Sequence, residues 1–256
     1  MEAAPRAQEL VAPQGWRSVE FISDLHLEAS QPANFEAWRR YMAATQADAV
    51  FILGDLFEAW IGDDSAAGPG FEGDCAEVLR AATRQRPIFF LHGNRDFLLG
   101  AGFAATTGVT LLADPTVFAF GSARWLLTHG DALCLDDTEY QAFRRQVRSP
   151  AWQAAVLARP LAERRMMAKA IRSESEDLKR TDREYADVDM PAALAWLQAA
   201  DAAVMIHGHT HKPREHDLDA THRRIVLSDW DPQAQPPRRE ALRLARDGAW
   251  QRVALA

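Results

Sequence analysis

The chain has 256 residues, of which 48% are hydrophobic and 25% are charged. This length fits one large domain, or one domain with an insertion, and the composition can bury a sizeable core. The formal net charge of −7 does not favour nucleic acid as a partner. Two cysteines, Cys75 and Cys134, provide no disulfide framework, and no apolar run approaches the roughly 18 residues that span a bilayer.

The chain begins with MEAAPRAQELVAPQG, a polar stretch rich in alanine and proline. It lacks the apolar segment of a secretion signal. We therefore expect a cytoplasmic protein with a disordered extension over residues 1–15 and a folded domain over residues 16–256.

Short apolar runs alternate with amphipathic stretches in the first half, which predicts a layered α/β domain. Strands are expected at 18–23, 49–53 and 87–91, with helices over 34–45, 72–84 and 97–106. Three antiparallel strands are expected next, at 109–112, 116–120 and 123–128. Further strands are expected at 203–206, 224–228, 241–245 and 249–254, the last two as a hairpin around Asp247-Gly248.

Between about residues 135 and 200 the pattern becomes helical, which predicts a helical cap inserted into the domain. Residues 139–183 contain eleven Lys or Arg and six Asp or Glu, interleaved with apolar side chains such as Phe143 and Trp152. Two interpretations remain open. The segment is either an ordinary set of amphipathic helices packed on the domain, or a basic and apolar lid that binds an anionic amphiphile or rests on an acidic membrane surface.

Five polar motifs lie at the ends of apolar runs: Asp24-x-His26, Gly54-Asp55, Gly93-Asn94, His129-Gly130-Asp131 and His207-Gly208-His209. Alone, an Asp-x-His pair is commonly a turn with a hydrogen-bonded histidine, and Gly-Asp or Gly-Asn pairs are ordinary turns. The histidines at 207, 209 and 211 form a His-x-His-x-His pattern, which is a moderate metal signal. Because α/β sheets carry their sites at the carboxyl ends of strands, we expect the motifs to meet.

Carboxylate and imidazole ligands together suit divalent Mn, Fe, Zn or Co rather than Mg or Ca. If Asp55 bridges, the set is sufficient for two ions, each with an open position. Two ions about 3.5–4 Å apart can hold a bridging hydroxide and phosphoryl oxygens for in-line displacement at phosphorus. Asp131, adjacent to His129, either orients a ligand or closes the turn.

These motifs resemble those of the calcineurin-like metallophosphoesterase superfamily, whose fold is an αββα sandwich of two mixed β-sheets flanked by helices. More closely, residues 17–230 are similar to the UDP-2,3-diacylglucosamine hydrolase family of lipid A biosynthesis. The segments that carry this similarity are LGDLFEAWIGDD (53–64), HGNRDFLLG (92–100), LTHGDALCLDD (127–137), YQAFR (140–144) and IHGHTHKP (206–213).

The resemblance implies two Mn2+ per subunit. One ion would be held by Asp24, His26, Asp55 and His209, and the other by Asp55, Asn94, His129 and His207. It also implies catalytic roles for Asn94, Arg95 and His207, and substrate contacts from Asn94, Arg95, Asp137, Ser175, Lys179, Arg183 and His207. The chain departs from the family pattern after Ser175: Lys179 replaces an Asn, and the expected Lys falls near Asp182 or Arg183.

Arg95 occupies a position where many superfamily members have a His that can protonate a leaving alkoxide. Arg cannot do so, because its pKa stays above about 12, but it can clamp phosphate oxygens and stabilise developing charge. A phosphate monoester leaving group, with a second pKa of about 6, needs little acid help. Pyrophosphate cleavage is therefore favoured over alkyl phosphodiester hydrolysis. The alternative role for Arg95 is an ion pair with Asp96 or a neighbouring carboxylate.

The resemblance thus implies a hydrolase of UDP-2,3-diacylglucosamine. Attack of a metal-bridged hydroxide on the α-phosphorus would give UMP and 2,3-diacylglucosamine 1-phosphate (lipid X). Because the substrate is amphiphilic, we expect peripheral association with the anionic cytoplasmic face of the inner membrane and no obligate protein partner. A general phosphodiesterase or nuclease, acting on cyclic nucleotides or nucleic acid, is an alternative. A non-catalytic scaffold is another, although it should lack ligands that are all present here.

Overall fold

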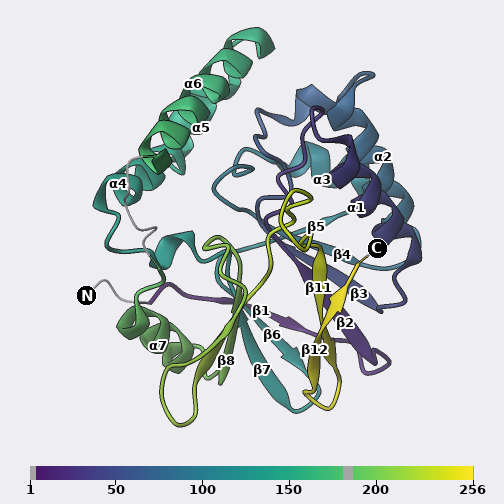
Figure 1. Cartoon of the computed structure of the whole chain (residues 1–256), viewed down its shortest axis with the longest axis vertical. Helices are drawn as coiled ribbons and strands as arrows, with labels where there is room; N and C mark the ends of the chain where they lie inside the picture. The colour runs from purple at the N-terminus through teal and green to yellow at the C-terminus, as the bar shows by residue number, and fades with distance from the viewer. Residues whose placement is uncertain (1–3, 181–186, 256) are drawn as a thin grey trace.

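Two six-stranded sheets pack face to face, with helices on the outer side of each (Figure 1). The computed structural model describes residues 4–180 and 187–255, including their side chains except those of residues 173–180. Sheet I has the order β12 (Trp250–Ala254), β11 (Glu240–Ala245), β2 (Ser18–Ile22), β3 (Ala49–Leu53), β4 (Ile88–Leu91) and β5 (Thr110–Leu112). Sheet II has the order β1 (Gln8–Val11), β6 (Thr116–Phe120), β7 (Ala123–Leu127), β8 (Val204–His207), β10 (Arg223–Val226) and β9 (Glu215–Asp217). The predicted αββα sandwich of two mixed sheets is confirmed.

Aromatic residues fill the layer between the two sheets. Strand β3, AVFIL, is buried at every position, as expected of a parallel strand covered on both faces. Its Phe51 stacks on Phe21 of β2 and Phe89 of β4, with ring centroids 5.0 and 4.7 Å away. Phe118 of β6 meets the same ring from sheet II at 4.7 Å. These contacts fix the relative position of the strands that carry the polar motifs.

Helices α1 (Pro32–Ala44), α2 (Phe71–Thr83) and α3 (Ala101–Thr107) cover the outer face of sheet I, and a short 3-10 turn, η1 (Asp63–Ala66), precedes α2 (Figure 1). Their buried side chains, including Trp38, Leu79 and Phe103, form one core cluster with sheet I. Helix α7 (Met190–Ala199) covers sheet II through Ala193 and Leu197. It lies inside the range predicted for the cap, but it packs on the sandwich.

A second 3-10 turn, η2 (Asp131–Leu133), leads to the lid, which we define as helices α4 (Thr138–Val147), α5 (Pro150–Leu157) and α6 (Leu161–Arg180). The side chains of Asp137 and Ser149 cap α4 and α5, and Pro150 occupies the first turn of α5, where its missing N–H costs nothing. The lid helices extend along one side of the sandwich (Figure 1).

Two expectations about the strands are wrong, and one strand is missing from the prediction. Residues 8–11 are not disordered, because β1 pairs in parallel with β6 and its Leu10 packs on the core between the sheets. Residues 110–112 do not join an antiparallel set, since β5 pairs in parallel with β4 at the edge of sheet I. Strand β9 was not expected at all. The hairpin of β11 and β12 is confirmed, with Gly248 at a φ of +88°.

Candidate metal centre

The polar motifs come from the carboxyl ends of parallel strands in both sheets. In sheet I, β2, β3 and β4 are parallel neighbours and lead to Asp24, Asp55 and Asn94. In sheet II, β7 and β8 are parallel neighbours and lead to His129 and the 207–211 loop. Because the two sheets face each other, the loops from both meet at one end of the sandwich.

Five polar residues in these loops have left-handed backbone conformations. They are Asp24 (φ 55°), His26 (φ 49°), Asp55 (φ 53°), His209 (φ 67°) and His211 (φ 53°). Such conformations cost roughly 1–3 kcal/mol each in a non-glycine residue and gather at functional sites. Close loop packing adds a further requirement, since a Cβ on Gly93 would overlap the Asp55 carboxylate. The surrounding structure therefore holds these loops in a shape that the backbone by itself does not favour.

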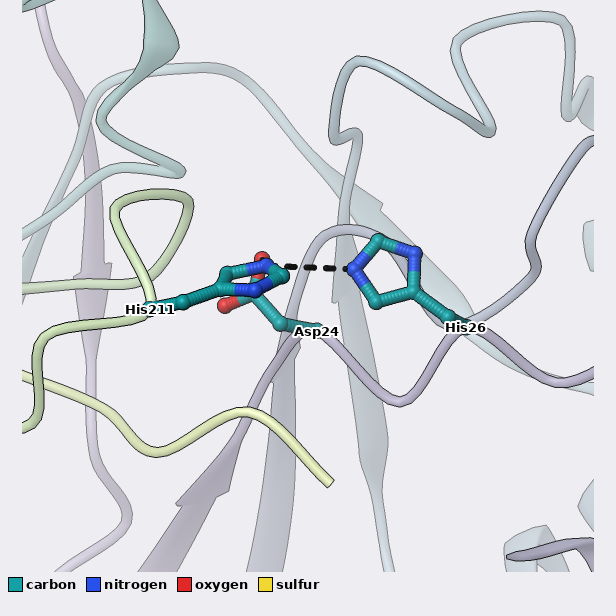
Figure 2. A group of neighbouring side chains, drawn as sticks. All are labelled: Asp24, His26 and His211. Atoms are coloured by element: carbon teal, nitrogen blue, oxygen red, sulfur yellow. Dashed lines mark hydrogen bonds and ion pairs between the residues drawn. The ribbon is translucent and has the colours of Figure 1, made fainter. Parts of the chain in front are cut away.

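Asp24, His26 and His211 form the first group of this cluster (Figure 2). The Nε2 atoms of the two histidines lie 3.2 Å apart, and His211 Nε2 is 3.5 Å from Asp24 Oδ1. Asp24 is fully buried and also accepts the backbone N–H of His209 at 3.0 Å. Two imidazole nitrogens and a carboxylate oxygen therefore converge on one point.

Asp55, Asn94, His129 and His209 form the second group. Asn94 Oδ1 lies 2.9 Å from His129 Nε2 and 2.8 Å from His209 Nδ1. Asp55 Oδ2 is 3.7 Å from His129 Nε2 and 4.0 Å from His26 Nε2. One Asp55 oxygen thus stands between a histidine of each group, which suits a bridging ligand.

The electrostatics of the cluster favour positive charge. Burial alone would lower the pKa of His129, but the charges of Asp55 and Asp24 raise it to about 9. Burial, together with the charge of Asp55, raises the pKa of Asp96 to about 7. Carboxylate, amide and imidazole donors in such a field are a set that holds transition-metal dications. The residues present therefore fit two divalent ions.

His207 does not join the cluster, contrary to the prediction. Its ring is fully buried, with Nδ1 2.9 Å from Gly208 O and Nε2 3.3 Å from the Arg224 guanidinium. The residue ends β8 in register with Val226 of β10, so its side chain packs within sheet II. The prediction assigned His209 to the first metal ion and His207 to the second. In the structure His211 lies in the first group and His209 in the second, so the assignment shifts by two residues along the loop. The His-x-His-x-His pattern contained His211, but the sequence alone does not tell which two of three histidines turn inward.

Arg95 lies beside the second group. Its backbone N–H donates to Asp55 Oδ1 at 2.8 Å, and its guanidinium is 3.5 Å from Glu58 Oε1. Asp96 instead accepts the backbone N–H groups of Leu56 and Gly93, both at 2.8 Å. The ion pair expected as the alternative role of Arg95 is therefore formed with Glu58 and not with Asp96.

The other predicted substrate residues are Asp137, Ser175, Lys179 and Arg183. Asp137 is exposed and caps α4, accepting the N–H of Tyr140 at 2.9 Å. The side chains of Ser175 and Lys179, and the whole of Arg183, lie outside the described residues.

The lid contacts the metal centre at several points. On α4, Tyr140 Oη and Arg144 Nε donate to the buried carboxylate of Asp131 at 2.6 and 2.8 Å. The Tyr140 ring lies 5.9 Å from that of His209 at an angle of 28°. Further along, Arg148 donates to Gly93 O at 2.9 Å. Between lid and domain is a pocket whose lining includes Trp60, Arg95, Phe97, Trp152, Val156 and Met167.

Comparison with known proteins gives a consistent result. Residues 18–213 match the family model of the calcineurin-like phosphoesterases. A UDP-2,3-diacylglucosamine hydrolase of Chromobacterium violaceum is 45% identical over 222 residues, which cover 83% of this chain and 90% of that protein. Proteins of the same name are 43% identical in Bordetella pertussis (88% of this chain, 91% of that one) and 41% identical in Coxiella burnetii (92% and 96%).

Proposed function

The chain belongs to the calcineurin-like phosphoesterase family and, within it, to the UDP-2,3-diacylglucosamine hydrolases, and from this premise we propose that it cleaves the pyrophosphate bond of UDP-2,3-diacylglucosamine. The products would be UMP and 2,3-diacylglucosamine 1-phosphate, an intermediate of lipid A biosynthesis. The observation that carries this proposal is the convergence of seven side chains able to bind metal, beside a lid with an apolar pocket.

Two Mn2+ ions are the proposed cofactors. The proposed first set is Asp24, His26, Asp55 and His211, and the proposed second set is Asp55, Asn94, His129 and His209. The distances within each group and the mixed oxygen and nitrogen donors support these sets. When bound, two such ions supply a water nucleophile of lowered pKa and neutralise charge on the phosphoryl oxygens.

Arg95 and Asn94 are the proposed catalytic residues of the chain itself. Arg95 borders the pocket between lid and domain, where its guanidinium can bind phosphoryl oxygens in two-point fashion. It stabilises the charge that develops as the bond breaks. No general acid is needed, because the leaving group is a phosphate monoester with a second pKa of about 6. Asp137, Ser175, Lys179 and Arg183 stay proposed contacts to the substrate headgroup.

The pocket between lid and domain is the proposed site for the acyl chains. Trp152 on α5 packs against Phe97 of the domain with ring centroids 6.0 Å apart. Met167 on α6 packs against the core cluster that helices α1, α2 and α3 form with sheet I. Arg164 fastens α6 to the domain, since its guanidinium donates to Asp64 Oδ1 at 2.8 Å and also to Ile61 O. An apolar wall next to an arginine that can bind phosphate suits a substrate that has both acyl chains and phosphate groups.

Peripheral association with the cytoplasmic face of the inner membrane is also proposed. Large apolar side chains on the lid are exposed, namely Leu157, Met166 and Ile171. Basic residues lie around them in the sequence, and such surfaces bind anionic lipid. Within residues 4–180 and 187–255, no helix has both the length and the apolar character needed to cross a bilayer.

The experiment that tests this function is Mn2+-dependent release of UMP from UDP-2,3-diacylglucosamine by the parent, Asp55→Ala and Arg95→Ala. We expect release that is abolished by a chelator, restored by Mn2+ and lost in both variants. A folded, Mn2+-loaded parent that hydrolyses bis-p-nitrophenyl phosphate but releases no UMP would instead indicate a general phosphodiesterase.

A further inference from the structure

Glu58 stands where the metal centre, the substrate-binding arginine and the lid meet. Its Oε2 is 3.1 Å from His26 Nδ1. Its Oε1 is 3.5 Å from the Arg95 guanidinium and 3.2 Å from Nε of Arg172 on α6. The Glu58 side chain is only 15% exposed. One carboxylate therefore contacts three groups with different tasks.

The contact with His26 fixes a ligand. Nε2 of His26 faces Asp24 and His211 in the cluster, whereas Nδ1 faces Glu58. The two side chains lie at ion-pair distance without an aligned hydrogen bond between them. A carboxylate beside the second ring nitrogen orients a metal-binding histidine and raises its basicity. For His129 in the second group, the backbone carbonyl of Leu53 has this role at 2.8 Å. Of these two histidines, His26 is the one backed by a charged side chain.

The contact with Arg172 extends this arrangement to the lid. Arg172 also donates to Glu28 Oε2 at 2.9 Å, and Glu28 lies two residues after His26. The lid arginine thus contacts both Glu28 and Glu58.

We propose that Glu58 is a positioning residue that orients His26 for the first metal and, through Arg172, couples metal binding to docking of helix α6. The inference rests on the metal sites of the proposed function. A metal ion on Nε2 would make the Nδ1 side of His26 more positive, and this charge would hold the Glu58 carboxylate where it contacts Arg172. Because binding free energies are linked, docking of α6 must strengthen metal binding by the factor by which metal strengthens docking.

The test uses the full-length protein and two readouts that need no substrate. Calorimetry measures Mn2+ affinity, and hydrogen exchange of the backbone amides of residues 161–172 measures docking of α6 with and without Mn2+. The variants are Glu58→Gln, Arg172→Met and the double variant. Glu163→Gln is the matched control, since Glu163 is an exposed α6 carboxylate that lies 3.8 Å from Arg159 of the lid.

We expect Glu58→Gln to weaken the first Mn2+ about 10–100-fold, the usual cost of losing such a partner. Arg172→Met should weaken it about fivefold or more, within the usual range of coupling. The double variant should bind Mn2+ no more weakly than Glu58→Gln, because both act through one carboxylate. Mn2+ should slow exchange in α6 of the parent and of Glu163→Gln, but not in the other variants.

Parental Mn2+ affinity in folded Glu58→Gln would overturn the inference and leave the proposed function intact. Additive losses in the double variant, or exchange in α6 that ignores Mn2+ in the parent, would also overturn the coupling. If Glu58→Gln does not fold, Arg172→Met decides, since Arg172 is on the lid and 35% exposed. A parent that binds no Mn2+ would overturn both this inference and the proposed function.

Discussion

A histidine serves as a ligand only if its free ring nitrogen faces the ion. In the 207–211 loop three histidines alternate with small residues, yet their rings have different surroundings. His207 faces Arg224 within sheet II, whereas His211 faces His26 and Asp24. Its Nδ1 side is also backed by Asp229, 3.7 Å away. This difference separates a histidine that packs inside the sandwich from one that we propose as a metal ligand.

Replacement of His211 and of His207 should therefore have different effects. His211→Gln should weaken the first Mn2+ by at least about 100-fold, the upper end of what loss of an outer partner costs. His207→Gln should keep both ions at near-parental affinity and lower the melting temperature instead, because it disturbs a buried contact. Calorimetry with Mn2+ and thermal melts of both variants check this. Two bound ions in His211→Gln would contradict the ligand sets.

At this scale the sequence predicted which side chains come together, apart from those of the last motif. Asp24, His26, Asp55, Asn94 and His129 could be placed because each follows or closes an apolar strand, and strand ends converge. The inward histidines of the last motif could not, because left-handed turns after β8 decide which rings face the cluster. Glu58 was not singled out, since nothing in its local pattern indicates a contact with the lid.

At the scale of elements, α4 ties the lid to the loop that carries His129. Asp131 at the end of that loop is fully buried and accepts from Tyr140 and Arg144. The Arg148 guanidinium lies 3.6 Å from the same carboxylate. Burial would raise the pKa of Asp131, but the charges of Arg144 and Arg148 hold it well below its usual range. The ionised carboxylate is thus an anchor for α4.

Arg144→Met should lower the free energy of unfolding by about 2–3 kcal/mol, because a buried carboxylate loses its nearest counter-charge while Arg148 remains. The folded-state pKa of Asp131 lies below its unfolded value of about 3.9. Its contribution is therefore present above about pH 4 and lost as the pH falls further. Urea unfolding at several pH values measures this, with exposed Arg145→Met on the same helix as control. Equal stabilities of the two variants at pH 7 would contradict the anchor.

A second prediction for the lid concerns the acyl pocket. Ala168 on α6 lines this pocket, whereas Ala170 is exposed and is not among the lining residues. Ala168→Trp should raise KM for UDP-2,3-diacylglucosamine about tenfold or more, since a lost apolar contact costs roughly 1–3 kcal/mol, and should spare bis-p-nitrophenyl phosphate. Ala170→Trp should change neither. Steady-state kinetics on both substrates check this. Equal KM values in the two variants would show that the acyl chains do not bind in this pocket.

The long central elements could be predicted because their apolar periodicity is strong, as in β3 with its five buried residues. Two edge strands, β1 and β9, could not. They have four and three residues, too few to reveal a period. β1 also depends on pairing with β6, far away in the sequence, whereas β9 pairs with the next strand, β10. The sheet to which β5 belongs is likewise decided by tertiary contacts with β4.

At the scale of the whole molecule, charge is unevenly distributed. The chain carries −7 overall, yet basic residues dominate over 139–183. Met166 on the lid is 65% exposed. A basic and apolar surface on an otherwise acidic protein is of the kind that binds anionic membranes, which supports the membrane association that we propose.

The Mn2+-loaded protein should therefore sediment with phosphatidylglycerol vesicles and be released by salt, because surface attraction is screened within about 8 Å at physiological ionic strength. Met166→Ser should reduce vesicle binding, whereas Val11→Ser should not, although Val11 is 67% exposed on β1. Vesicle binding that neither salt nor Met166→Ser reduces would contradict membrane binding through the lid.

We propose that the metal centre directs water to the α-phosphorus of a UDP-linked lipid. The most direct measurement is turnover of UDP-2,3-diacylglucosamine in H2 18O with Mn2+, followed by mass spectrometry of both products. We expect one 18O atom in UMP, none in 2,3-diacylglucosamine 1-phosphate and no turnover by Asp55→Ala. Label in the lipid phosphate, or UMP release that persists in Asp55→Ala, would contradict it.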